Sequence, residues 1–110
     1  MICDAWDVVT VPFPFADREG SKRRPALVIS TERFNRNGHS ILAMITTARL
    51  SWPTDSPLTN LTSCGLSRPC VVRFKLFTLD NRLIVKRIGH LTDGDKDQVA
   101  QTLHAILPAY

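Results

Sequence analysis

The chain has 110 residues, of which 44% are hydrophobic and 22% are charged, and its formal net charge at pH 7 is +4. This length and composition fit one folded domain over residues 1–110 and exclude a disordered or fibrous protein. The sequence shows no apolar run long enough to span a membrane, no signal peptide and no cysteine or histidine spacing typical of a zinc site, so we expect a cytoplasmic protein without membrane contact, metal or cofactor.

The first predicted element is a strand at residues 7–15, where successive side chains alternate between two faces. Pro12 and Pro14 cannot donate a backbone hydrogen bond, so the second half of this strand should lie at a sheet edge or a bulge. A polar loop over residues 16–23 follows. The continuous apolar run at residues 26–30 then predicts a short strand that is buried on both faces.

The middle of the chain contains fewer predicted elements. Residues 31–38 predict one helical turn that ends at an Asn-Gly pair, and residues 41–46 predict a third strand. Residues 49–67 are rich in proline, serine and threonine, which is typical of loops, with one weak strand expected near residues 57–61.

Two more strands are predicted in the last third of the chain. Residues 70–74 predict a fourth strand that the following residues continue or turn, and a turn is expected at residues 80–81. Residues 83–88 predict a short strand, which Gly89 should break.

A C-terminal helix closes the predicted fold. Thr92 is suited to cap its N-terminus, Asp93 and Asp95 fall in its first turn, and apolar residues recur from Val99 to Leu107 at helical spacing. Short strands with prolines at their edges favour a small barrel over an open sheet. We therefore predict a mainly β fold, a small barrel with a C-terminal helix.

Positive charge is concentrated beside the predicted strands. Lys22, Arg23 and Arg24 directly precede a strand, and Pro25 fixes the backbone that aims Arg24. Between residues 68 and 87, six basic residues stand against one acidic residue. Such clusters suit the binding of a phosphate backbone, although each one alone also fits an ordinary solvated surface.

Other polar and aromatic residues follow the third predicted strand. Thr46 and Thr47 end it, Arg49 lies just beyond, and Trp52 in the next loop fits either stacking on a base or simple packing. The three histidines have no obvious partner in the sequence, so we do not expect them to be catalytic.

Five blocks, in the right order, resemble the MazF/PemK toxin family from Trp6 to about Leu107. They are residues 7–15, 22–30, 43–46, 71–80 and 88–91. The resemblance implies an SH3-like small barrel that forms a homodimer. It also implies the toxin component of a type II toxin-antitoxin system, with a cognate antitoxin whose acidic segment occupies the RNA groove.

The activity implied by this resemblance is metal-independent, sequence-specific endoribonuclease cleavage of single-stranded RNA. Attack by the 2′-hydroxyl would leave 2′,3′-cyclic phosphate and 5′-hydroxyl ends. The resemblance assigns catalytic roles to Arg24, Thr46 and Arg73, and to Glu19 as a carboxylate of the first loop. The expected RNA-binding residues are Lys22, Arg23, Thr47, Arg49, Trp52 and Lys75.

The sequence departs from the family pattern at two positions. Trp6 stands where the family usually has glycine, which puts the local turn in question, and Lys75 stands where some members carry an aspartate as general base. An inactive relic that binds RNA or an antitoxin therefore stays open. A non-catalytic gyrase poison of the same fold also stays open, although such toxins end in a Trp-Gly-Ile-type tail and this chain ends in Leu-Pro-Ala-Tyr.

Overall fold

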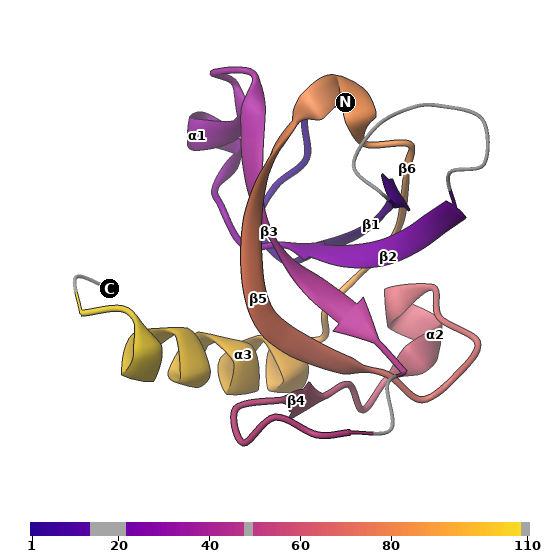
Figure 1. Ribbon diagram of the computed structural model, residues 1–110, viewed down its shortest axis with the longest axis vertical. Coiled ribbons are helices and arrows are strands. Elements are labelled where there is room, and N and C mark those ends of the chain that lie inside the picture. Colours follow the sequence, from indigo (N-terminus) through magenta and orange to yellow (C-terminus); the bar gives the residue numbers. More distant parts are fainter. Residues whose placement is uncertain (14–21, 48–49, 109–110) are drawn as a thin grey trace.

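The computed structural model describes residues 1–13, 22–47 and 50–108. Its strands form one six-stranded antiparallel sheet in the order β4-β5-β3-β2-β1-β6, and this sheet curls into a half-barrel (Figure 1). The elements in chain order are β1 (Asp7–Phe13), β2 (Lys22–Val28), α1 (Glu32–Asn35), β3 (His39–Thr46), β4 (Ser56–Pro57), α2 (Leu61–Cys64), β5 (Val71–Asp80), the 3-10 helix η1 (Asn81–Leu83), β6 (Lys86–His90) and α3 (Asp93–Ile106). The predicted mainly β fold with a C-terminal helix is confirmed.

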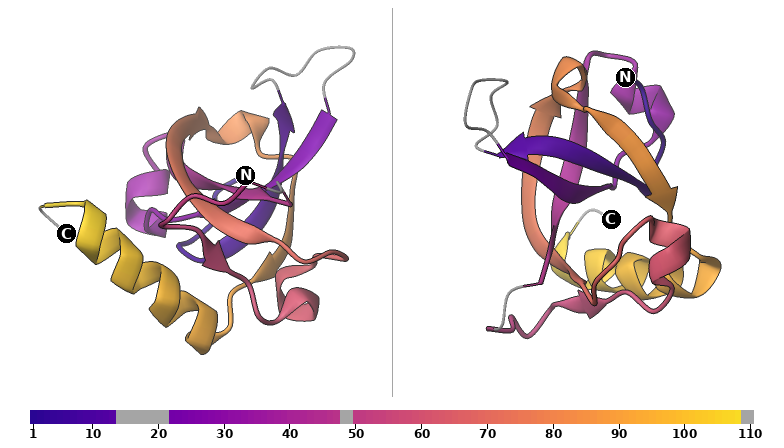
Figure 2. Two further views of the ribbon diagram at one scale, coloured as in Figure 1. Left: turned by 60° about the horizontal axis from the view of Figure 1, so that its bottom comes forward. Right: turned by 90° about the vertical axis from the view of Figure 1, so that its right-hand side faces the viewer.

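Two hydrophobic clusters form the core, one on each face of the sheet. In β1, Val8 belongs to the first cluster and Val9 to the second, and in β2 Leu27 and Ala26 divide in the same way. Because successive strand residues point to opposite faces, residues 26–28 are fully buried on both sides, as the apolar run predicted. Figure 2 shows α3 crossing one end of the curled sheet, where Val99 joins the first cluster.

The second half of β1 agrees with the expectation of an edge as far as Phe13, while Pro14 and Phe15 of the predicted strand lie outside the described residues. β6 pairs with β1 only from Asp7 to Thr10, with a register shift between Val8 and Val9. Beyond that point β1 pairs with β2 alone within the described residues, so Pro12 needs no second partner strand.

The turn before β1 keeps a left-handed backbone although it carries a tryptophan. Trp6 has φ of 75°, its N–H donates to the Val28 carbonyl at 2.7 Å, and its carbonyl accepts from the Leu91 N–H at 3.0 Å. A bulky residue with positive φ costs about 1–3 kcal/mol. Packing of the Trp6 ring against the first core cluster offsets part of that cost.

The start of β2 differs from the prediction. Lys22 and Arg23 were expected in a loop, but they pair with Phe13 and Pro12 and begin the strand. The hairpin formed with β1 extends the strand four residues ahead of the apolar run, so backbone pairing overrides local polarity there.

The weak strand that was expected near residues 57–61 is present only as the short β4 at Ser56–Pro57, and an unpredicted short helix, α2, begins at Leu61. The Asn60 side chain caps α2 by accepting from the Ser63 N–H at 3.0 Å, and Gly65 ends it with φ of 70°. Gly89 was expected to break a strand but lies inside β6. A Cβ at this position would come within 2.3 Å of the Cys64 carbonyl carbon. This glycine therefore allows α2 to pack directly against β6.

A strand was expected at residues 83–88, but Asn81–Leu83 form η1 and the strand β6 covers Lys86–His90. The other elements agree with the sequence. Thr31 caps α1, β5 runs unbroken to Asp80, and Thr92 caps α3 by accepting from the Asp95 N–H at 3.4 Å. The buried Asp95 carboxylate also accepts from the Thr59 hydroxyl at 2.7 Å and so fixes the segment before α2. No helix in the described part of the chain is long and apolar enough to cross a membrane.

Candidate active site

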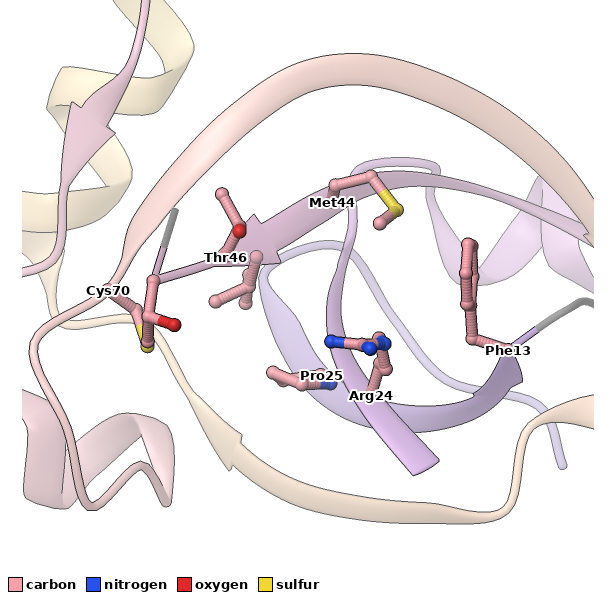
Figure 3. Close-up of a pocket in the computed structure, with 8 residues that line it drawn as sticks. Phe13, Arg24, Pro25, Met44, Thr46 and Cys70 are labelled. Atoms are coloured by element: carbon pink, nitrogen blue, oxygen red, sulfur yellow. The ribbon is translucent and has the colours of Figure 1, made fainter. Parts of the chain in front are cut away.

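An open pocket lies where β2 and β3 stop pairing. The ladder between these strands ends at Ala26 and Met44, and Pro25 has no N–H with which to continue it. Two residues beyond this last pair stand Arg24 on β2 and Thr46 on β3, which face one pocket of about 280 Å³ (Figure 3). The full lining is Phe13, Arg24, Pro25, Met44, Ile45, Thr46, Thr47 and Cys70.

Arg24 presents its guanidinium group to this pocket. Its Cζ atom lies 5.4 Å from the centre of the Phe13 ring, and among the residues that the structure describes no carboxylate forms an ion pair with it. A guanidinium is protonated at every working pH and carries donors in a planar fork that matches phosphate oxygens. The pocket therefore suits a phosphate group.

A second pocket of about 240 Å³ adjoins the first and shares Pro25, Thr47 and Cys70 with it. Its lining includes Arg68, which follows α2 and is one of the six basic residues counted in the sequence between residues 68 and 87. We refer to these two adjoining pockets, one lined by Arg24 and the other by Arg68, as the groove. The local excess of basic residues included Arg68, but only the topology places it beside the pocket of Arg24.

Arg23 and Lys22 do not share the pocket of Arg24. Because side chains alternate along β2, Arg23 lines a different pocket of about 270 Å³ together with Arg82. Lys22 is exposed and is not among the residues that line any of the three pockets described above. The side chains of these three consecutive cations therefore point to two different faces of the sheet.

Arg73 is held in an ion pair with Asp55, a partner that the sequence did not identify. Its Nε and Nη2 atoms donate to the two carboxylate oxygens of Asp55 at 3.1 and 2.9 Å, and Nη2 also donates to the Leu50 carbonyl at 2.5 Å. The Trp52 ring stacks on the same guanidinium, with Cζ 5.1 Å from its centre. This pairing lowers the pKa of Asp55 and raises the pKa of Arg73.

The remaining expected site residues fall into two groups. Lys75 is exposed on β5 and, within the described chain, does not line the groove. Glu19 and Arg49 lie outside the described residues.

His90 has a partner that the sequence did not reveal. Its Nδ1 atom lies 2.8 Å from Oδ1 of Asp7, a buried carboxylate that also accepts from the Asp4 N–H at 2.9 Å. Arg87 approaches the same carboxylate at 3.7 Å. The pairing of β1 with β6 brings Asp7 and His90 together across 83 positions, which the sequence alone could not show.

The three cysteines are free and buried, in agreement with reduced thiols. Burial raises the pKa of the Cys70 thiol, which lines the groove, and raises the pKa of Cys64 to about 11. Both therefore stay protonated at neutral pH, and neither has the thiolate character of a nucleophile.

Comparisons with known proteins agree on one family. The family described as PemK-like, MazF-like toxin of type II toxin-antitoxin system matches residues 4–107. The chain is similar to MazF from Deinococcus radiodurans, with 24% identity, a TM-score of 0.76 and 98% of each chain covered. The comparison with curated proteins gave no match.

Two further solved structures are similar. An endoribonuclease in complex with its cognate antitoxin, from a mycobacterial species, has 17% identity and a TM-score of 0.74, with 97% of this chain and 94% of that chain covered. Toxin MazF-mt6 from Mycobacterium tuberculosis has 22% identity and a TM-score of 0.71, with 90% of this chain and 93% of that chain covered. At these identities the likeness establishes a common fold.

Proposed function

The chain belongs to the PemK-like, MazF-like toxin family of type II toxin-antitoxin systems, and from this premise we propose that it is a metal-independent endoribonuclease. Its substrate would be single-stranded RNA, cut in the cytoplasm at a short sequence. The single observation that carries the proposal is the common pocket of Arg24 and Thr46, at the point where β2 and β3 separate.

The chemistry needs few groups because RNA supplies its own nucleophile. The 2′-hydroxyl oxygen forms a bond to phosphorus as the bond from phosphorus to the 5′-oxygen breaks, which leaves a 2′,3′-cyclic phosphate and a 5′-hydroxyl end. Negative charge grows on the non-bridging oxygens during this step. Arg24 would donate hydrogen bonds to these oxygens, and the Thr46 hydroxyl would help to seat the phosphate.

Two protons move in this reaction. The proton of the 2′-hydroxyl needs an acceptor, and we keep Glu19 of the first loop as the proposed base. The resemblance gives Arg73 the role of proton donor to the leaving 5′-oxygen, but the ion pair with Asp55 raises the pKa of Arg73 and makes that transfer harder. We therefore propose that water donates the proton to the leaving 5′-oxygen and that Arg73 is a charged group beside the pocket.

The groove from Arg24 to Arg68 offers a path for the RNA chain, and the net charge of +4 favours such a polyanion. The same cations would attract an acidic antitoxin segment, which would inhibit by occupying the groove. A solved relative bound to its cognate antitoxin supports a partner of this kind. We also propose a homodimer as the active assembly.

The proposal is tested by incubating the purified protein with a long synthetic transcript in EDTA. We expect cuts at one short motif, with 5′-hydroxyl ends that a polynucleotide kinase labels directly and cyclic phosphates on the upstream fragments. A parallel incubation with DNA gyrase and supercoiled plasmid should show no effect. An intact transcript together with gyrase poisoning would contradict the proposal and favour the non-catalytic toxin, whereas RNA binding without any cut would favour the relic.

A further inference from the structure

We propose that Asp55 is a positioning residue that, through Arg73, holds Trp52 as a stacking surface for an unpaired RNA base beside the Arg24 pocket. The inference rests on the proposed function, because it assigns a part of the RNA to a part of the site. Its starting point is the segment from Leu50 to Asp55. Three of its residues, Leu50, Trp52 and Asp55, contact the guanidinium group of Arg73 on β5.

The Asp55 carboxylate joins this segment to β5 and closes the turn that carries Trp52. It accepts two hydrogen bonds from Arg73 and a third from the Trp52 N–H at 2.9 Å, while the Asp55 N–H donates back to the Trp52 carbonyl at 3.0 Å. Its side chain is only 7% exposed and that of Arg73 only 13% exposed. β4 pairs with β5 immediately after Asp55, so the segment is fixed from both directions.

This arrangement leaves Trp52 in the position of a platform. Stacking on Arg73 covers part of the indole, yet Trp52 keeps 42% of its surface exposed. An indole held by a cation and a short turn has little rotamer freedom left to lose when a second planar group stacks on it. Neighbouring residues 50, 51, 53 and 54 are also exposed, so access to the ring is open.

The platform lies next to the reaction pocket. Arg73 is the register partner of Met44 across β5 and β3, and Met44 lines the pocket that Arg24 and Thr46 face. A nucleotide whose phosphate sits at Arg24 can then direct an unstacked base of the same or the adjacent nucleotide toward Trp52. Stacking of this kind accepts any base, and it contributes to binding rather than to the chemical step.

Single abasic nucleotides, placed in turn around the mapped cleavage site, test the inference. Cleavage by the wild type is compared with that by Trp52→Ala and Asp55→Ala. The matched controls are Phe34→Ala, which removes another aromatic residue with 42% exposure, and Glu32→Ala, which removes the carboxylate of the exposed pair with Arg36. Binding of a non-cleavable analogue with a 2′-deoxy sugar at the cut is measured in parallel.

In the wild type, we expect one abasic position to raise KM by about 5- to 150-fold. Trp52→Ala and Asp55→Ala should show the same rise in KM with the intact substrate, while kcat stays near the wild-type value. An abasic nucleotide at that position should then raise the KM of these two variants no further. Both control variants should keep the penalty. If Asp55→Ala does not fold, Asp55→Asn keeps the side-chain shape and serves the same comparison.

A full abasic penalty in Asp55→Ala would overturn the positioning role, and a full penalty in Trp52→Ala would overturn the stacking surface. A loss confined to kcat in Asp55→Ala would place the ion pair in the chemistry and also contradict the inference. A wild type that binds the analogue with the abasic penalty but cuts no RNA would overturn the proposed function alone. Absence of binding by the wild type would overturn both.

Discussion

Two arginines beside the same pocket differ in what their guanidinium groups already contact. Arg73 has a carboxylate, a backbone carbonyl and an indole as partners, and its side chain is 13% exposed. Arg24 lies beside the Phe13 ring, is exposed, and within the described chain forms no ion pair.

The difference separates structural from functional charge. A guanidinium whose donors point at protein acceptors stabilises the local fold and loses the capacity to bind a ligand. One whose donors point into an open pocket can bind an anion at no cost in broken contacts. By this reasoning Arg24 is the group that meets the phosphate, and Arg73 is the group that shapes the surface around it.

The largest expected effect is on the Arg24 side of the comparison. Arg24→Ala should lower the cleavage rate at saturating RNA by at least about 100-fold, because a donor to the growing negative charge is lost. Arg24→Lys should recover only part of the rate, since an ammonium cannot form the two-pronged contact. The rates are measured in single turnovers, with Arg33→Ala on α1 as the control for the same loss of charge. Equal cleavage rates for Arg24→Ala and Arg33→Ala would contradict the assignment of Arg24 as the group that binds the phosphate.

The second effect is on stability and concerns the Arg73 side. Asp55→Ala should lower the urea midpoint of unfolding several times more than Glu32→Ala does. Without Asp55, the nearly buried guanidinium of Arg73 loses its counterion, whereas the pair of Glu32 with Arg36 is exposed. Arg24→Ala should leave the midpoint close to that of the wild type. Circular dichroism during urea titration measures all three midpoints. Equal midpoints for Asp55→Ala and Glu32→Ala would show that the ion pair of Asp55 with Arg73 does not stabilise the fold.

The smallest effect is a difference in pH dependence. The pKa of Asp55 is lowered in the folded protein, by Arg73 first and by the Trp52 N–H as well, from an unfolded value of about 3.9. Its contribution to stability is therefore complete above about pH 4 and is lost as the pH falls through the lowered folded pKa. The free energy of unfolding of Asp55→Asn should decline less steeply than that of the wild type below pH 4. Parallel slopes would mean that this carboxylate does not gain its stabilisation from Arg73.

The sequence predicted well what local patterns determine. Alternation predicted the first strand, the apolar run at residues 26–30 predicted a strand buried on both faces, and Thr92 predicted the start of α3. Backbone pairing changed the strand ends, because Lys22 and Arg23 join the hairpin whatever their polarity. The cap pair of Asn60 and Gly65 could have predicted α2 but was passed over in a proline-rich segment.

The site was predictable only in part, for a topological reason. Arg24 and Thr46 stand out locally, one beside a proline and the other at a strand end, and the fold brings them to one pocket. Asp55 lies in a loop that local patterns describe only as polar, and only the pairing of β4 with β5 carries it to Arg73. The contact of Asp7 with His90 likewise depends on a ladder between the first and the last strand.

The account is tested most directly by a crystal structure of the protein with an oligonucleotide that carries a 2′-deoxy sugar at the cleaved position. We expect the guanidinium of Arg24 to donate to the non-bridging oxygens of the scissile phosphate, with Thr46 on the same phosphate and the pair of Asp55 with Arg73 unbroken. A scissile phosphate bound to Arg73, with Asp55 displaced and Arg24 facing solvent, would contradict it.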